Sequence, residues 1–183
     1  MGEALFAGLL AAGTPREQVV VVERSPERAA ALRADHGIEV TDDLAAVERA
    51  QIVVLAVKPN DVAGVLAQVG PRLGPATVVV SVAAGVSLAR LEAALPDGVP
   101  VVRVMPNTPA LVGQGMAALS PGSSCTPEQL ERARALLAAS GRTVVVPEYQ
   151  QDAVTAVSGS GPAYVFYVAD AMIEAGVLLG LSR

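Results

Sequence analysis

Four residues near the start of the chain have the types and spacing to bind a charged ligand. Gly2 opens a helical pattern, and Glu23 follows a short apolar run 21 residues later. In dinucleotide-binding turns, a glycine opens the first helix and an acid about 20 residues on binds the ribose. Arg24 and Ser25 would instead suit a 2′-phosphate, so NADH and NADPH both stay open. A solvated turn with a helix cap explains Glu23 to Ser25 equally well.

Three more candidate segments each follow a continuous apolar run directly. They are Ala56, Val57, Lys58 and Pro59; then Ala83, Ala84 and Gly85; then Met105, Pro106 and Asn107. In open α/β sheets, ligands bind at the carboxyl ends of the strands. Small residues at such ends let a ligand approach the backbone. Three such segments at the ends of neighbouring strands therefore indicate a binding site along one edge of the sheet.

A glycine- and serine-rich segment precedes the last helical pattern. It comprises Ser158, Gly159, Ser160 and Gly161. A loop of this kind at the start of a helix offers free N–H groups and hydroxyls to an anion such as a carboxylate. The alternative is a flexible linker whose Ser160 caps the helix.

The remaining reactive side chains do not form a pattern. The single cysteine, Cys125, excludes an internal disulfide and is compatible with a reducing compartment. The single histidine, His36, lies too far from Cys125 in the sequence to suggest a metal site, so none is expected. Asp170 and Glu174 lie one helical turn apart, either as an acid/base pair or, as we favour, on an exposed helix face.

Composition restricts the classes of function. The chain has 183 residues, 52% of them apolar, and 13 basic against 18 acidic groups give a net charge of −5. Lys58 is the only lysine, and the arginines form no stripe, so a nucleic-acid partner is not expected. Segment 163–181 is apolar but carries Asp170 and Glu174, which favours a buried helix over a membrane span. A cytoplasmic protein is the expectation.

The segments that carry these residues alternate between two patterns. Strands are expected at 18–22, 38–40, 51–57, 77–82, 99–105, 116–119 and 143–146. Helices are expected at 3–12, 26–36, 43–47, 61–69, 87–95, 127–139, 152–157 and 163–179. Continuous β-branched strands separated by helices indicate βαβ units and a buried parallel sheet. The predicted fold is α/β, a Rossmann-like doubly wound parallel sheet at 1–151, followed by the start of an all-α domain at 152–183.

Five of these motifs together resemble the pyrroline-5-carboxylate reductase family. They are AVKP at 56–59, SVAAGV at 81–86, RVMPNTP at 103–109, DAVTAVSGSGPAY at 152–164 and GLSR at 180–183. The resemblance implies a Rossmann domain, a helical dimerisation domain and a homodimer or higher homo-oligomer. It also implies reduction of 1-pyrroline-5-carboxylate to L-proline by NADPH or NADH, the last step of proline biosynthesis.

The resemblance also implies where ligands bind. It places the cofactor at Gly2, Glu23, Arg24, Ser25, Ala56, Val57, Lys58, Pro59, Ala83, Ala84 and Gly85. It places the substrate near Met105, Asn107, Thr108, Ser158, Gly159, Ser160 and Gly161. Because the cofactor carries the hydride, neither a nucleophile nor a metal is expected. Lys58 is interpreted as a phosphate or structural support rather than as an acid.

Two departures from the family are visible. Glu23 stands where the family usually has a neutral residue, which favours NADH or dual use. The family also has an earlier first strand and further helices after Arg183, so this chain is expected to be a fragment whose catalytic residue lies elsewhere. In a sheet of order 3-2-1-4-5-6 that first strand would be central.

Two alternatives remain open. A β-hydroxyacid dehydrogenase shares the architecture, but it needs a catalytic lysine on the long interdomain helix, and 163–181 contains none. The other alternative is a truncated product that lacks catalytic activity.

Overall fold

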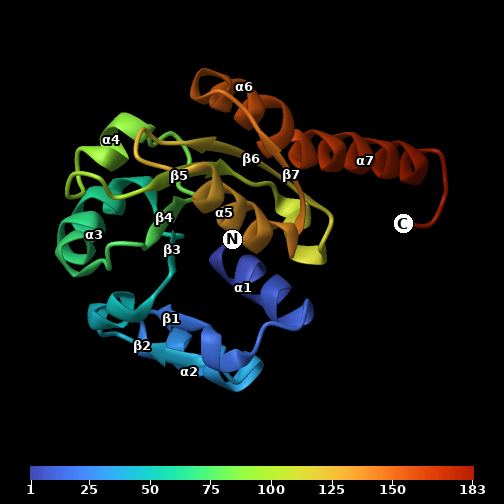
Figure 1. The fold of residues 1–183 in the computed structure, drawn as a ribbon. Helices are drawn as coiled ribbons and strands as arrows, with labels where there is room; N and C mark the ends of the chain where they lie inside the picture. Colours follow the sequence, from blue (N-terminus) through green and yellow to red (C-terminus); the bar gives the residue numbers. More distant parts are fainter.

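The computed structural model describes residues 1–183 as two sheets with their flanking helices and a projecting helix (Figure 1). A two-stranded sheet pairs β1 (Val20–Val22) with β2 (Glu39–Thr41). A five-stranded sheet has the order β3 (Ile52–Leu55), β4 (Val78–Ser81), β5 (Val101–Met105), β6 (Gly115–Pro121) and β7 (Gly141–Val145). β1 and β3 therefore belong to different sheets. No helix has the length and apolar character to cross a membrane.

The larger sheet is mostly parallel, as the sequence predicts, with one antiparallel pairing that the sequence pattern does not reveal. β3, β4 and β5 pair in parallel, and so do β6 and β7, but β6 runs antiparallel to β5. A parallel neighbour needs a crossover of a dozen or more residues. Only residues 106–114 connect β5 to β6, and they include a 3-10 turn (Thr108–Val112) and Gly113 at φ +70°. This short connection reverses the chain.

The sheet is buried on both faces by its crossover helices. α3 (Val62–Val69) and α4 (Leu88–Glu92) cover one face, where Leu66 and Leu91 are fully buried. α5 (Pro127–Ala138) covers the other face with Ala133 and Leu137. A strand covered on both sides is apolar at nearly every position. The uninterrupted valines of β4, none of them measurably exposed, meet that requirement.

The first helix joins the two layers. α1 (Gly2–Ala11) places Leu5 in the core of the large sheet. Its next residue, Phe6, packs instead in the core that β2 and α2 (Pro26–His36) form. Consecutive helical residues point about 100° apart, so one helix can contribute to two cores.

Residues 151–178 are almost continuously helical, without the loop that the sequence suggested at 158–161. α6 (Gln151–Val154) passes into a π-helical turn (Thr155–Gly159), and α7 (Gly161–Leu178) follows one residue later. The flexible-linker alternative is therefore wrong for 158–161. Ser160 makes no side-chain capping bond. The short helix expected at 43–47 is a 3-10 helix (Leu44–Arg49).

Candidate functional site

The carboxyl ends of three strands gather at one edge of the large sheet. β3, β4 and β5 are parallel neighbours, so the segments that follow them share this edge (Figure 1). Ala56, Lys58 and Ala84 are exposed there. Gly85 has φ +73°, and a Cβ on it would meet no atom within 4 Å. The edge is open and lined by small residues, and the only lysine has no hydrogen-bond or ion-pair partner in the structure.

The start of α1 reaches the same edge. A Cβ built on Gly2 would lie 2.8 Å from the Cβ of Ala56, so only glycine permits this approach. No side chain caps the first turn of α1. The first N–H groups of a helix have no partner within it, and they favour an anion. This combination fits a phosphate group of a nucleotide.

The trio after β1 already has internal hydrogen bonds. Glu23 Oε1 accepts a bond of 2.9 Å from the Ser25 amide, and Ser25 Oγ accepts one of 3.3 Å from the Arg28 amide. Ser25 therefore caps α2, as the structural alternative proposed. Arg24 is exposed and forms no ion pair, which leaves its guanidinium available to a ligand.

Two distant segments meet at the end of β5. Asn107 Nδ2 donates to the carbonyl and to the hydroxyl of Ser158, at 3.4 Å each. A Cβ on Gly159 would lie 2.6 Å from Cε of Met105, so the two residues are in close contact. Thr108 is exposed beside them, at the start of the 3-10 turn. The structure thus brings together the two segments expected to bind substrate.

Helical backbone, rather than a loop, presents the Gly-Ser segment. The Ser160 amide donates to the Thr155 carbonyl at 2.9 Å, five residues back, as in a π-helix. The Ser160 hydroxyl has no hydrogen-bond partner in the structure. Single π-helical turns occur frequently at functional sites.

Sequence reasoning missed a buried arginine that connects the sheet to the helical end of the chain. Arg103 in β5 is only 8% exposed. It donates to Glu148 at 3.1 Å and to Asp152 at 3.3 Å, and Glu148 also accepts the Leu88 amide at 2.6 Å. A lone charge within the apolar run VVRVM was the available signal, because a buried charge requires a partner.

Gln151 was also missed. It is fully buried, and its Nε2 donates to Ser120 Oγ at 2.8 Å and to the Ala118 carbonyl at 3.3 Å. These bonds attach α6 to β6. Together with the ion pairs of Arg103, these hydrogen bonds fix the position of the π-helical turn relative to the strand ends.

The other reactive side chains form no second candidate site. His36 bonds Glu3 at 3.0 Å. Desolvation raises the pKa of Cys125, which disfavours a reactive thiolate. Asp170 and Glu174 pair with Arg183 at 3.6 and 2.7 Å on the exposed α7. No group of three or more His, Cys, Asp or Glu side chains is placed to hold a metal.

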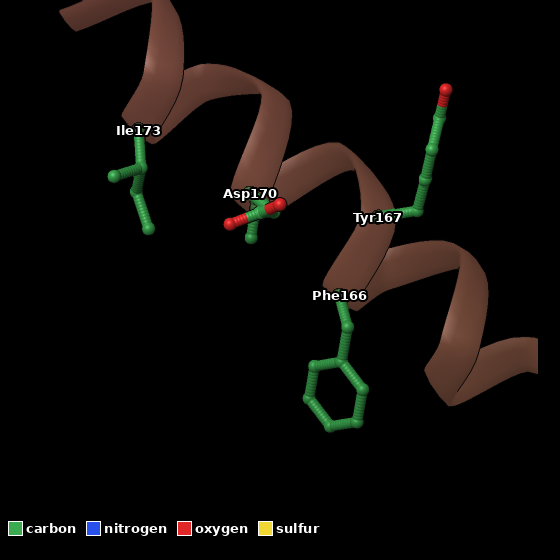
Figure 2. A pocket seen from close by; sticks show the side chains of 5 residues that line it. Phe166, Tyr167, Asp170 and Ile173 are labelled. Carbon is green, nitrogen blue, oxygen red and sulfur yellow. The ribbon is translucent and has the colours of Figure 1, made fainter. Parts of the chain in front are cut away.

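A hollow on α7 does not form an enclosed site. Only α7 residues line it, and Figure 2 shows Phe166, Tyr167, Asp170 and Ile173 projecting from the one helix. Enclosed ligand sites need walls from several elements. The strand-end edge therefore remains the candidate site.

Two family models match the chain. Residues 1–85 match "NADP oxidoreductase coenzyme F420-dependent", and residues 148–183 match "Pyrroline-5-carboxylate reductase dimerisation". The pyrroline-5-carboxylate reductase of Mycobacterium tuberculosis H37Rv is 50% identical over all of this chain, which spans 64% of that relative's length. The enzyme of Corynebacterium melassecola is 47% identical, and the chain covers 69% of it.

A solved structure shares the fold. It is the crystal structure of Plasmodium falciparum pyrroline carboxylate reductase with NADP bound, and its TM-score to this chain is 0.89 at 29% identity. The alignment covers 100% of this chain and 68% of that one.

Proposed function

Since this chain belongs to the pyrroline-5-carboxylate reductase family, we propose that it takes part in the reduction of 1-pyrroline-5-carboxylate to L-proline. NADPH or NADH is the reductant, and the reaction is the last step of proline biosynthesis. The observation that carries the proposal is the contact of Met105 and Asn107 with the Ser158–Gly159 backbone at the strand-end edge. Two segments separated by about fifty residues thereby form one surface.

The proposed nucleotide site follows the strand ends. Gly2 and the uncapped first turn of α1 face the diphosphate, with Lys58 beside them. The other proposed contacts are Ala56, Val57, Pro59, Ala83, Ala84 and Gly85. Glu23 accepts hydrogen bonds from the ribose hydroxyls, and Arg24 donates to a 2′-phosphate, so we propose that both nucleotides are used. The NADP in the Plasmodium structure supports this class of cofactor.

The proposed substrate site lies between β5 and the π-helical turn. The free hydroxyl of Ser160 holds the carboxylate of the substrate. When bound, the nicotinamide supplies the hydride that reduces the imine carbon. The chain itself orients the two rings, and the close contact of Met105 with Gly159 leaves no room for water between these two residues. Holding two reactants in one geometry is a major source of rate acceleration.

We further propose two functional units, 1–151 for the nucleotide and 152–183 for assembly. α7 exposes Phe166, Tyr167 and Leu178, and the matching family model is a dimerisation model. A second copy is the proposed partner of this apolar surface. A cytoplasmic location is proposed on the basis of the single cysteine.

The test is to mix purified chain with 1-pyrroline-5-carboxylate and either nucleotide, and to measure nucleotide oxidation and proline formation. Nucleotide binding is measured separately by titration calorimetry. Lys58→Ala is expected to lower the affinity for both nucleotides about tenfold, because one charge-assisted hydrogen bond is lost. Arg24→Ala is expected to weaken NADPH alone.

Arg132→Ala is the matched control, since Arg132 is exposed on α5. It is expected to leave both affinities unchanged. Failure to bind either nucleotide would contradict the proposed site. Turnover of a β-hydroxyacid but not of the imine would contradict the proposed substrate.

A further inference from the structure

The π-helical turn leaves one carbonyl without a helical donor. In an α-helix, each carbonyl accepts from the amide four residues later. For Ser158 that residue is Pro162, which has no N–H. Asn107 supplies the missing donor: its Nδ2 lies 3.4 Å from the Ser158 carbonyl and 3.4 Å from the Ser158 hydroxyl. The sequence thus removes a local bond, and the fold replaces it with a long-range one.

A second carbonyl of the turn also bonds a side chain. The Ser160 amide donates to Thr155 rather than to Ala156. The Ala156 carbonyl accepts instead from the Tyr164 hydroxyl at 3.0 Å. Side chains therefore bond both carbonyls. An α-helical register would give the Ala156 carbonyl the Ser160 amide as donor, but it would give Ser158 none, because Pro162 has no N–H.

The other end of the Asn107 amide is engaged as well. Its Oδ1 accepts from the Met116 amide, at the start of β6, at 2.9 Å. One amide thus connects the end of β5, the start of β6 and the π-helical turn. This arrangement requires a donor and an acceptor on one short side chain, which asparagine has and aspartate lacks. Both functional ends of Asn107 are used within the chain.

We infer that Asn107 is a positioning residue that holds the π-helical turn 155–159 against the strand ends, rather than a ligand of the substrate. It acts through Ser158, whose neighbours Gly159 and Ser160 face the proposed substrate site. Gly159 sets the closest approach, because its Cα lies against the Met105 side chain. The inference rests on the proposed function only for its effect on turnover.

The first test measures the turn itself by hydrogen–deuterium exchange. Asn107→Asp keeps an acceptor for Met116 but removes the donor to Ser158. Exchange in a peptide covering 155–164 is expected to become about fivefold faster, since one hydrogen bond contributes about 1 kcal/mol. A peptide from α5 should not change. Tyr164→Phe is expected to give a smaller increase in the same 155–164 peptide.

Asn60→Asp is the matched control, because Asn60 is the only other asparagine and is exposed without a side-chain hydrogen bond. Its exchange should equal that of the unmodified chain. Unchanged exchange at 155–164 in Asn107→Asp overturns the inference. A uniform increase that includes α5 also overturns it, because the effect is then on global stability.

The second test is kinetic. Asn107→Asp should raise the KM for 1-pyrroline-5-carboxylate about tenfold and leave the KM for NADPH unchanged. If Asn107 bound the nicotinamide directly, its replacement would raise the KM for NADPH. A raised KM for NADPH in Asn107→Asp therefore contradicts the inference. If the unmodified chain lacks turnover, the proposed function fails, whereas the exchange result still decides the role of Asn107.

Discussion

The helices at the two ends of this chain are both strongly apolar, yet only one of them is buried. α1 buries Ala4, Leu5 and Phe6 between two cores, whereas no residue of α7 is buried. Figure 1 shows α1 between the sheets and α7 projecting from the molecule. The chain has two phenylalanines, one on each helix: Phe6 is 9% exposed and Phe166 is 65% exposed. Apolar composition alone therefore does not decide burial.

What differs is the surface that each helix meets. α1 lies where two sheets each present an apolar face, so both of its apolar sides find partners. α7 is attached only at its first turns and meets no second layer. A helix that is apolar all round needs neighbours all round, and a large exposed apolar surface indicates an interaction site. Four predictions test this difference, in order of expected effect.

The largest effect is expected from Phe6→Ala. Phe6 packs against Leu32 and Val40 in the small core, and its ring meets His36 edge-on with centroids 4.9 Å apart. Truncation of a buried phenylalanine costs about 3–5 kcal/mol. Urea denaturation should show a lower unfolding free energy by this amount. A loss under about 1 kcal/mol would mean that α1 does not join the layers.

Glycines on the two helices should respond with opposite sign. A Cβ on Gly8 would lie 2.8 Å from Ser140 Oγ and 2.9 Å from the Ala139 carbonyl, so Gly8→Ala is expected to destabilise by about 1–2 kcal/mol. On Gly176 it would meet only Leu181, at 3.5 Å. Gly176→Ala should therefore stabilise by up to about 1 kcal/mol, through helix propensity. Thermal melting of both variants measures the contrast, and the same sign for both would contradict it.

A pH effect of about 1 kcal/mol or less is expected at Glu3. The hydrogen bond from His36, with further help from Arg28, holds the pKa of this half-exposed carboxylate below its ordinary value, against desolvation. A lowered folded pKa stabilises at pH values above the unfolded pKa of about 4.3. The stabilisation is lost as the pH falls through the folded value.

Denaturation between about pH 6 and 3, a window set around that unfolded pKa, tests the effect. Glu3→Gln should flatten this part of the stability curve. Glu174→Gln on the exposed α7 is the control and should leave the curve unchanged, since its partner Arg183 is also exposed. If the unfolding free energy of Glu3→Gln falls between pH 6 and 3 as steeply as that of the unmodified chain, the interaction of Glu3 with Arg28 and His36 contributes nothing measurable to stability.

The smallest stability effect is expected from Phe166→Ala. At a protein concentration where sedimentation shows monomers, the change should stay within about 0.5 kcal/mol. Self-association at higher concentration should weaken, because the side chain belongs to the exposed surface of α7. A stability loss like that of Phe6→Ala would show that α7 folds back onto the body of the chain.

Much of the architecture was predictable because it is locally encoded. Strand positions followed from β-branched runs, and the α/β Rossmann-like class and the family membership are confirmed. Helix starts followed from caps: Thr126 and Gln129 form a capping box, and Ser25 and Ser87 cap α2 and α4. These signals act over a few residues, so the sequence displays them directly.

The antiparallel β6 was not predicted, nor was the π-helical turn. Whether a strand runs parallel or antiparallel to its neighbour depends on whether the segment between them can cross over the sheet. The alternation of strand and helix patterns in the sequence does not reveal this. The sequence also placed Arg103 in a strand without indicating Glu148, which lies 45 residues away. The roles proposed for the site residues remain predictions.

Local sequence patterns were enough to locate most strands and helices, to mark helix starts by cap residues and helix ends by glycines, and to identify the family. Hydrophobic periodicity and cap residues reflect interactions between residues that are close in the sequence, so they can be recognised from the sequence alone. Only the tertiary structure decided that α1 is buried while α7 is exposed, that β6 reverses, and that Asn107 bonds Ser158 across 51 residues. Those outcomes depend on which surfaces meet, because burial and long-range hydrogen bonds are properties of pairs of segments.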